Sequence, residues 1–328
     1  MAGCAVETCL PPDKRFRHYP ALIWRFLLCK RRCDVVVVGF YGQLLMIFVR
    51  LLTRKPVLYD IYISTLDTMV YDRERACAGS LKAMVFQFVD TITLRMADRI
   101  ILETEDHIHD YAAKFGIPES TFEHLFLTVD EEVISPRERN PNKGGDFLVH
   151  FHGEYAPFHG VSTILRAAHL LRDAGVTFRL IGRGITYETD RALADELKLT
   201  NVRFIDWVDY ENLADVMTDA DCCLGIFGAN PRTLRVLTNK VVEALAAGQP
   251  LITARNAPVQ ELVIDGESAI LVRQAEPEDL AGAILRLKND PDLAKRIGAN
   301  GRRVYETKCA NAIFAARLRD IIQHMAEQ

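Results

Sequence analysis

The chain has 328 residues, of which 40 are Lys or Arg and 44 are Asp or Glu, so its formal net charge is −4. Hydrophobic residues make up 49% and charged residues 26%, which excludes a disordered chain, a collagen-like fibre, a coiled-coil rod and a disulfide miniprotein. The negative net charge and the lack of a basic-aromatic motif argue against nucleic-acid binding. At about 100–200 residues per domain, the length predicts two domains.

The first 60 residues are basic and show neither the pattern of a signal peptide nor that of a membrane span. They hold ten Lys and Arg against four Asp and Glu, a balance that suits anionic lipid as well as an ordinary solvated surface. The charge-free run 35–49 is shorter than the roughly 18 apolar residues of a spanning helix. We interpret it as a buried strand followed by a packed helix. Eight cysteines without a CxxC pair predict reduced thiols and no zinc site.

Short apolar, β-branched runs alternate along the chain with stretches of helical periodicity. Continuous apolar runs suit strands buried on both faces of a parallel sheet, and the alternation predicts right-handed βαβ units. The predicted strands are 34–40, 56–60, 98–102, 147–151, 178–182, 202–205, 222–227, 250–253 and 269–272, and the predicted helices include 21–33, 161–171, 280–287 and 310–325. The sequence therefore predicts an α/β fold.

Residues 135–146 are rich in Pro, Asn and Gly without apolar periodicity, as is typical of a linker. We predict an N-terminal domain at 1–140, a C-terminal domain at 145–305 and a final helix, 306–328, that returns toward the N-terminal domain. No strand is predicted before Val35. We therefore expect a shortened N-terminal domain, in a chain that begins partway into a fold.

Two stretches of the C-terminal domain combine turn residues with polar side chains. The glycine-bearing turn 153–160 joins a strand to a helix, where backbone N–H groups can bind phosphate, although a plain tight turn fits the same residues. Further along, Lys240 and Glu243 are three residues apart and share a helix face. Cations and amides suit a diphosphate and a carboxylate suits a ribose diol, whereas a surface ion pair has the same spacing.

The histidines offer no metal site. His150 and His152 lie two residues apart on a strand and point to one face, but two ligands are too few, so we predict core or edge histidines. His159, beside Gly160 in the turn, is the histidine expected in the site.

Residues 147–305 resemble the donor-binding half of glycosyltransferase family 4, the retaining nucleotide-sugar transferases of the GT-B fold. The matching motifs are G-x-Y-x-P-F-H-G-V at 153–161, R-L-I-G-R-G at 179–184, N-V-R-F-I-D-W-V at 201–208, A-D-C-C-L-G-I-F at 220–227, N-K-V-V-E-A-L-A-A-G-Q-P-L-I-T at 239–253 and P-V-Q-E-L at 258–262. The first domain resembles the acceptor half more loosely. The resemblance implies two Rossmann-like, doubly wound parallel-sheet domains facing across a cleft, with the N-terminal domain incomplete.

The resemblance also implies an activity, which is transfer of a sugar from a nucleoside diphosphate-sugar to a glycan or lipid-linked acceptor with retention, without a metal or cofactor. Catalytic roles are expected for Asp72, Arg73 and His159. The expected diphosphate-binding residues are Gly153, Arg235, Asn239 and Lys240, and the expected ribose- and sugar-binding residues are Tyr155, Glu243 and Glu261. The protein is expected in the cytoplasm, bound peripherally to an anionic membrane on its inner face.

The sequence also departs from the family pattern. Arg235 stands where the family usually has the first of two glutamates, and Glu154 and His159 replace the usual Arg and Lys of the turn. The family's opening strand and glycine-rich loop are not found. Two alternatives therefore stay open: a non-catalytic GT-B partner subunit or truncated reading frame, and a nucleotide-sugar epimerase of the same architecture.

Overall fold

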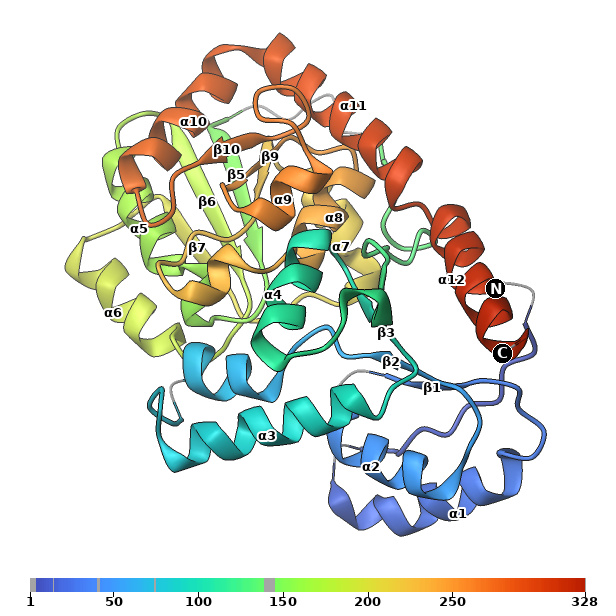
Figure 1. Cartoon of the computed structure of the whole chain (residues 1–328). Helices are drawn as coiled ribbons and strands as arrows, with labels where there is room; N and C mark the ends of the chain where they lie inside the picture. Colours follow the sequence, from blue (N-terminus) through green and yellow to red (C-terminus); the bar gives the residue numbers. More distant parts are fainter. Residues whose placement is uncertain (1–3, 14, 40–41, 74, 139–144, 328) are drawn as a thin grey trace. The chain divides into compact units, whose positions relative to one another are not determined.

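The computed structural model describes residues 4–13, 15–39, 42–73, 75–138 and 145–327 (Figure 1). The chain forms two compact units. Unit 1 comprises Met1–Val70, Ala76–Leu125 and Phe314–Gln328, and unit 2 comprises Tyr71–Arg75 and Phe126–Ile313. The predicted linker 135–146 includes residues 139–144, which lie outside the described residues, so the domain limits drawn there stay predictions.

Unit 1 is built on a parallel sheet with the strand order β1-β2-β3-β4. Its strands are β1 (Val36–Val38), β2 (Val57–Asp60), β3 (Arg99–Leu102) and β4 (Phe122–His124), and its helices are α1 (Tyr19–Cys29), α2 (Gln43–Leu52), α3 (Leu81–Arg95), α4 (Glu105–Phe115) and most of α12 (Asn311–Glu327). On α12, Ile321 and Met325 pack against Leu58 of the central strand β2. The C-terminal segment thereby completes the core of unit 1.

Unit 2 is built on a parallel sheet with the strand order β10-β9-β8-β5-β6-β7. Its strands are β5 (Phe147–His152), β6 (Val176–Ile181), β7 (Val202–Ile205), β8 (Cys222–Leu224), β9 (Leu251–Ala254) and β10 (Ile270–Val272). Its helices are α5 (Val161–Leu170), α6 (Tyr187–Glu196), α7 (Leu213–Thr218), α8 (Asn239–Ala246), α9 (Ala257–Leu262), α10 (Pro277–Asn289) and α11 (Pro291–Lys308). The strand order runs one way from β5 to β7 and the other way from β8 to β10.

The unit 2 sheet is covered on both faces, which explains its continuous apolar strands. Val149 and Phe151 of β5 pack in a cluster with residues of α5 and α10. Cys223 and Leu251 belong to a second cluster with residues of α8 and α11. Helix α5 also packs against α10, and helix α8 packs against α11 (Figure 1). Cys222 and Cys223 lie in different clusters because successive strand residues point to opposite faces.

The secondary structure matches the predicted elements closely, with two corrections. The run 222–227 was predicted as one strand, but β8 ends at Leu224, because beyond Gly225 the backbone bonds to a side chain and to the turn after β5. Strand β4 was not predicted, since its sequence, Phe-Glu-His, lacks a β-branched run. It forms by pairing with β3 at the edge of the sheet.

Candidate functional site

The strand order of unit 2 reverses direction between β5 and β8. In open α/β sheets, ligands bind at the carboxyl ends of the strands at such a point. The turn after β5 and the loop after β8 meet there, because the Phe227 N–H donates to His159 O at 3.0 Å and the Gly228 N–H donates to Phe158 O at 3.1 Å. The two loops therefore form one surface.

Glycine allows this close approach. Gly160 has a φ of +67°, and a Cβ built on it would lie 2.4 Å from Gly228 N. Gly160 is also the N-cap of helix α5, so the turn leads directly into a helix start, where the first backbone N–H groups have no partner within the helix. The predicted glycine-bearing turn thus leads into a helix N-terminus.

Lys240 is buried beneath this turn. Its Nζ lies 3.0 Å from His159 Nε2, and a Cβ on Gly153 would lie 3.1 Å from the same Nζ. His159 Nδ1 donates to Glu154 O, so its Nε2 is the acceptor for the Lys240 ammonium. Burial lowers the pKa of Lys240 to about 8, and burial together with the Lys240 charge holds the pKa of His159 well below its usual value.

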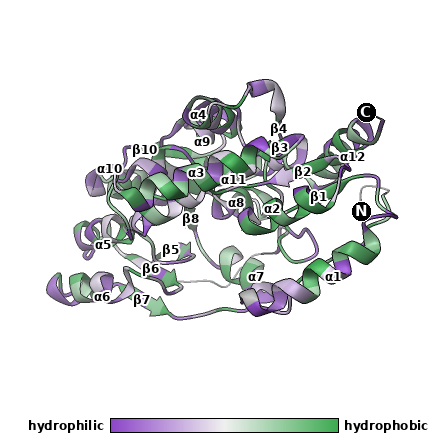
Figure 2. Cartoon of the chain, turned by 60° about the horizontal axis from the view of Figure 1, so that its bottom comes forward, coloured by the Kyte–Doolittle hydropathy of each residue, from purple (hydrophilic) through white to green (hydrophobic). Residues whose placement is uncertain are grey.

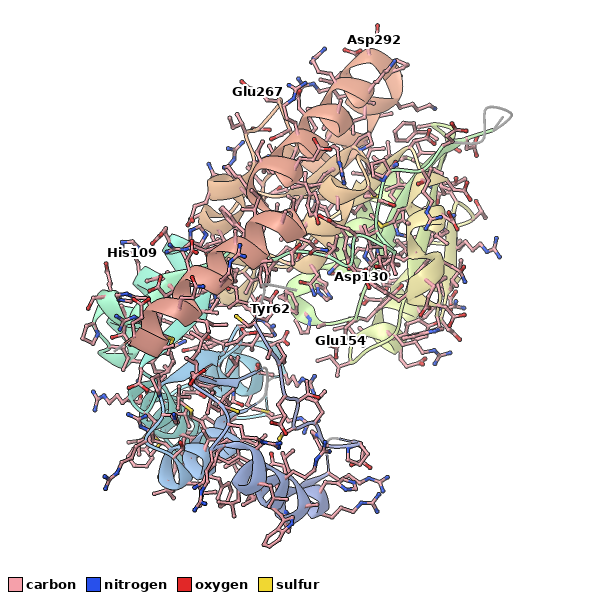
Figure 3. All side chains as sticks on the ribbon, turned by 90° about the vertical axis from the view of Figure 1, so that its right-hand side faces the viewer. Tyr62, His109, Asp130, Glu154, Glu267 and Asp292 are labelled. Carbon is pink, nitrogen blue, oxygen red and sulfur yellow. The ribbon has the colours of Figure 1, made fainter. Side chains whose placement is uncertain are left out.

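Arg232 provides a second buried cation. Its Nη1 donates to Asp72 Oδ2 at 2.5 Å, and its guanidinium lies 4.2 Å from the Phe158 ring centroid. Burial raises the pKa of Asp72, while the Arg232 charge opposes that shift. Arg73 forms a longer ion pair, 3.5 Å, with Glu154 of the turn, whose position Figure 3 labels. Asp72 and Arg73 belong to the 71–75 segment of unit 2.

Three cationic or polar residues lie on and just before α8. The guanidinium of Arg235, which is expected to bind phosphate together with Lys240, lies 5.8 Å from the Tyr71 ring centroid, and its role stays a prediction. Asn239 is exposed at the first turn of α8. Arg232 is not among the predicted site residues, although its charge acts on both Lys240 and His159. Its burial beside Asp72, 160 residues earlier, has no signal in local spacing.

Glu243 forms a hydrogen bond with His152 of strand β5, which was predicted to be a core or edge histidine. Its Oε2 lies 2.8 Å from His152 Nε2, and His152 Nδ1 lies 2.9 Å from His150 Nε2. Lys240 and Glu243 do share a face of α8, and the Glu243 charge favours the charged form of Lys240. One buried helix end therefore presents both a cation and a carboxylate.

Two further predicted residues lie elsewhere in unit 2. Tyr155 is fully buried, with its ring 6.2 Å from that of Phe151 and 5.2 Å from that of Tyr187. Glu261 is half-buried on α9, and its backbone carbonyl accepts from Lys308 Nζ. Their predicted contacts with ribose or sugar stay predictions.

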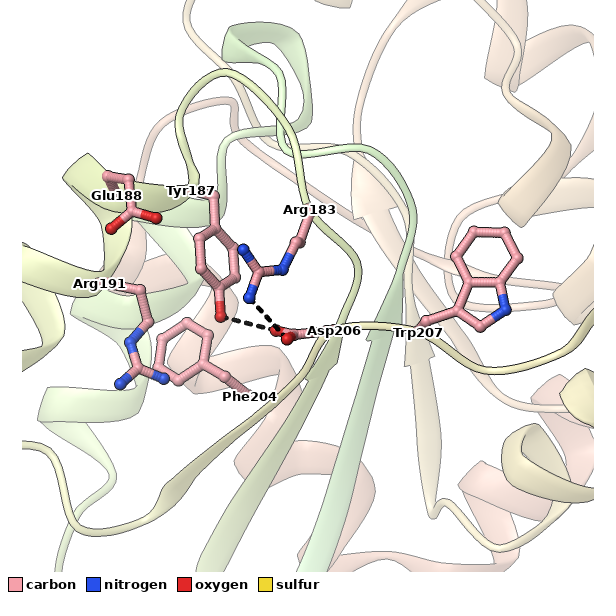
Figure 4. A pocket seen from close by; sticks show the side chains of 7 residues that line it. All are labelled: Arg183, Tyr187, Glu188, Arg191, Phe204, Asp206 and Trp207. Atoms are coloured by element: carbon pink, nitrogen blue, oxygen red, sulfur yellow. Dashed lines mark hydrogen bonds and ion pairs between the residues drawn. The ribbon is translucent and has the colours of Figure 1, made fainter.

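A pocket of about 590 Å³ opens at the carboxyl ends of β6 and β7 (Figure 4). Asp206 accepts from Arg183 at 2.6 Å and from the Tyr187 hydroxyl at 2.9 Å, while the Trp207 ring is largely exposed. The Arg191 guanidinium stacks 4.6 Å from the Phe204 ring centroid. The pocket is lined by Arg183, Tyr187, Glu188, Arg191, Phe204, Asp206 and Trp207. It offers planar faces and charged hydrogen-bonding groups.

Within the described ranges, no three His, Cys, Asp or Glu side chains gather closely enough to hold a metal ion. None of the helices formed by the described residues is long and apolar enough to cross a bilayer. The eight cysteines, all of which lie within the described residues, form no disulfide with one another.

The family model for glycosyl transferases group 1 matches residues 134–304, more than half of the chain. The chain belongs to this family. The predicted resemblance is thereby confirmed, and the matched residues include the turn after β5, the loop after β8 and helix α8.

Curated relatives of this group 1 glycosyl transferase carry names from the same family. An uncharacterized glycosyltransferase of Methanocaldococcus jannaschii is 28% identical over 178 residues, covering 54% of this chain and 47% of the relative. An MMP alpha-(1->4)-mannosyltransferase of Mycolicibacterium hassiacum is 28% identical over 199 residues, covering 59% and 46%. The chain spans about half the length of the curated relatives it matches.

Solved structures show the fold. The crystal structure of Anabaena Alr3699/HepE in complex with UDP and glucose has a TM-score of 0.76 at 15% identity, and the match covers 95% of this chain and 84% of the HepE chain. The sucrose-phosphate synthase of Thermosynechococcus elongatus has a TM-score of 0.76 at 18% identity, and the match covers 96% of this chain and 80% of the synthase chain. The predicted GT-B architecture of two parallel-sheet α/β units is confirmed, whereas the predicted roles of the site residues stay predictions.

Proposed function

We propose that this chain binds a nucleoside diphosphate-sugar and transfers its sugar, with retention, to a glycan or lipid-linked acceptor. The observation that carries the proposal is the buried Lys240 beneath a glycine turn that leads into the start of α5. A cation inside a protein interacts with an anion more strongly than one in water, so this arrangement suits a diphosphate. The family name, and relatives such as the GDP-mannose-dependent mannosyltransferase of Corynebacterium glutamicum, support it.

The proposed chemistry is stabilisation of the leaving group. As the bond between the sugar and the diphosphate breaks, the diphosphate gains negative charge, and preorganised donors that face this charge lower the barrier. Lys240 would donate to the phosphate from a position held by His159, and the α5 N-terminus would add backbone N–H groups. Asp72 would orient Arg232 toward the same site, and Arg73 would act from the 71–75 segment. No metal or cofactor takes part in this proposal.

The pocket at the ends of β6 and β7 is proposed to hold the base of the nucleotide. Strand β6 neighbours β5, whose turn would hold the diphosphate, and ligands of doubly wound sheets lie along this edge. The exposed ring of Trp207 offers a stacking face, while Arg183 and Asp206 offer donors and acceptors to a polar ring. The identity of the base decides between donors such as UDP- and GDP-sugars.

Calorimetric titration with UDP, GDP, UDP-glucose and GDP-mannose tests the donor proposal. We expect one nucleotide class to bind, and Lys240→Met to weaken that binding by about tenfold or more, since the variant loses a charge-assisted hydrogen bond. Lys295→Met is the matched control, because Lys295 is exposed on α11. Equal affinity of wild type and Lys240→Met would remove Lys240 from the site.

A binding subunit without transferase activity is the second candidate. It is favoured by the pairing of Arg232 with Asp72 and of Arg73 with Glu154, which leaves these cations already neutralised. Incubation of a bound nucleotide-sugar with wild type separates the candidates. Release of the nucleoside diphosphate, by transfer or by hydrolysis, supports the enzyme, and tight binding without release supports the subunit.

We also propose that unit 1 contacts an anionic membrane from the cytoplasmic side. Helix α3 exposes Leu81, Met84, Val85 and Phe88, which follow one helix face, and Lys82 stands exposed beside them. Helices α1 and α2 add the exposed apolar side chains of Trp24, Leu28 and Leu51, and Arg25 of α1 is exposed as well. Figure 2 colours the ribbon of the chain by hydropathy and shows many hydrophobic positions along α2. Apolar and cationic side chains together bind anionic lipid more strongly than either kind alone.

Co-sedimentation with phosphatidylglycerol and phosphatidylcholine vesicles tests the membrane proposal. We expect binding to the anionic vesicles alone, and its reduction in the variant Met84→Ser with Phe88→Ser. Leu170→Ser, at an exposed apolar residue of unit 2, is the control. Equal sedimentation with both kinds of vesicle would contradict the proposal.

A further inference from the structure

A series of hydrogen bonds runs from strand β6 through strand β5 to Glu243 on helix α8. Arg179 on β6 lies opposite His150 on β5, and its Nε donates to His150 Nδ1 at 3.4 Å. His150 Nε2 and His152 Nδ1 are 2.9 Å apart, and His152 Nε2 is 2.8 Å from Glu243 Oε2. Three strand residues are thus connected in series to a side chain on α8.

The chemistry of the side chains determines which nitrogen donates and which accepts in each of these hydrogen bonds. A guanidinium has no acceptor, so His150 Nδ1 must accept and His150 Nε2 must carry the proton. His152 Nδ1 then accepts that bond, and its own proton sits on Nε2, directed at Glu243. Both nitrogens of both rings are satisfied, as buried polar groups require. Burial, together with the Arg179 charge, holds the pKa of His150 well below its usual value, so this ring stays neutral.

The side chains that form these hydrogen bonds are buried against the sheet and are not surface residues. His150 is fully buried, and the side chains of His152 and Glu243 are only 12% and 11% exposed. Val149 and Phe151, the alternate residues of β5, pack into the opposite cluster, so the strand pleat sets the direction of both histidines. Within the described part of the chain, no protein group donates to Glu243 Oε1, which leaves that oxygen to a ligand.

We propose that His152, backed by His150, is a positioning residue that fixes the Glu243 carboxylate to accept from the 2′- and 3′-hydroxyls of the donor ribose. The inference rests on the proposed function, since it assumes a nucleotide at this site. A carboxylate fixed at Oε2 keeps Oε1 in a defined direction, so it loses less conformational entropy on binding. His152 itself does not touch the ligand in this arrangement.

The ratio of the affinities for UDP or GDP and for the matching 2′-deoxynucleotide measures how well Glu243 binds the ribose hydroxyls. We expect wild type to prefer the ribonucleotide by about tenfold or more, and His152→Phe to reduce the preference toward one. His152→Gln should restore it, because the glutamine amide can donate in place of Nε2. Pyrophosphate affinity should stay unchanged in all three proteins, and His109→Phe, at an exposed histidine of unit 1, is the control. An unchanged preference in His152→Phe would overturn the inference.

A second measurement needs no variant. Nitrogen-15 NMR of histidine-labelled wild type should show both His150 and His152 with the proton on Nε2 and a bare Nδ1. The opposite tautomer at His152 would overturn the inference even if the variants failed to fold. Failure of wild type to bind any nucleotide or pyrophosphate would instead reject the proposed function.

Discussion

At the scale of single residues, the burial of Lys240 decides how the proposed donor site responds to pH. Its pKa is lowered to about 8 from an ordinary value of 10.5, so the ammonium is charged at neutral pH and loses its proton above about pH 8. An uncharged amine no longer attracts a diphosphate. The affinity of the site should therefore depend on pH in a range where exposed lysines stay charged.

We predict that nucleoside diphosphate affinity falls by up to about tenfold per pH unit above pH 8, because binding then requires uptake of a proton. Calorimetry at pH 7, 8, 9 and 10 measures the fall. Lys240→Met should bind more weakly at pH 7 and show a flat profile over this range. A wild-type profile as flat as that of the variant would contradict the assignment.

The same pKa shift predicts a change in stability. The folded protein releases the Lys240 proton at about pH 8 and the unfolded chain at about 10.5, so the unfolded state binds more protons between these values. Stability relative to Lys240→Met should therefore rise with pH across this window, by about 1.4 kcal/mol per pH unit. Urea unfolding of both proteins at pH 7.5, 9 and 10 measures the difference. A constant difference would show that Lys240 is not buried as described.

At the scale of elements, the site depends on two loops that touch through glycines. A Cβ on Gly160 would collide with the Gly228 backbone, and the φ of +67° is strained for alanine. The loop after β8 reaches Arg232 within four residues of Gly228, so a displaced turn would move both buried cations. The contact between the loops therefore matters for the fold and for the site.

We predict that Gly160→Ala lowers the free energy of unfolding by about 2 kcal/mol or more and weakens nucleotide binding as well. Gly282→Ala is the matched control, because Gly282 is an exposed position inside α10 with nothing within 4 Å of an added Cβ. That variant should be neutral or more stable by up to about 1 kcal/mol, as helix propensity predicts. Equal effects of the two substitutions in urea unfolding would count against the close contact.

At the scale of the whole molecule, the C-terminal helix serves unit 1 although it follows unit 2 in sequence. Residues Phe314–Gln328 belong to unit 1, where Ile321 and Met325 cover Leu58. A cut or mutation at the end of the chain should therefore act on a sheet formed more than 200 residues earlier. The sequence predicts a final helix, 306–328, that returns toward the N-terminal domain, and this division of the chain stays a prediction.

We predict that Ile321→Ala with Met325→Ala destabilises unit 1 by about 2 kcal/mol or more per substitution, since each leaves a cavity. Hydrogen exchange should accelerate in β2 and β3 and stay unchanged in β5 and β6. The control Ile313→Ala removes a half-exposed side chain of unit 2 and should change little. Equal acceleration in both sheets would show that the units do not unfold separately.

Periodicity and turn chemistry in the sequence predicted most of the strands and the parallel α/β fold, and the resemblance of its motifs over residues 147–305 predicted the family. These signals are local, because a strand, a helix or a glycine turn is specified within about ten residues. The same reasoning placed Lys240 and Glu243 on one helix face. The predicted cleft between the domains stays a prediction, as do the assigned roles of the site residues.

Only the tertiary structure decided which side chains meet at the site. Arg232 pairs with Asp72 from 160 positions away, and Glu243 bonds to His152 from 91 positions away. No spacing rule covers such pairs, because they depend on strand order and on the way loops pack. For the same reason, the sequence predicted His150 and His152 only as core or edge histidines, whereas the structure connects them by hydrogen bonds to the Glu243 carboxylate on α8.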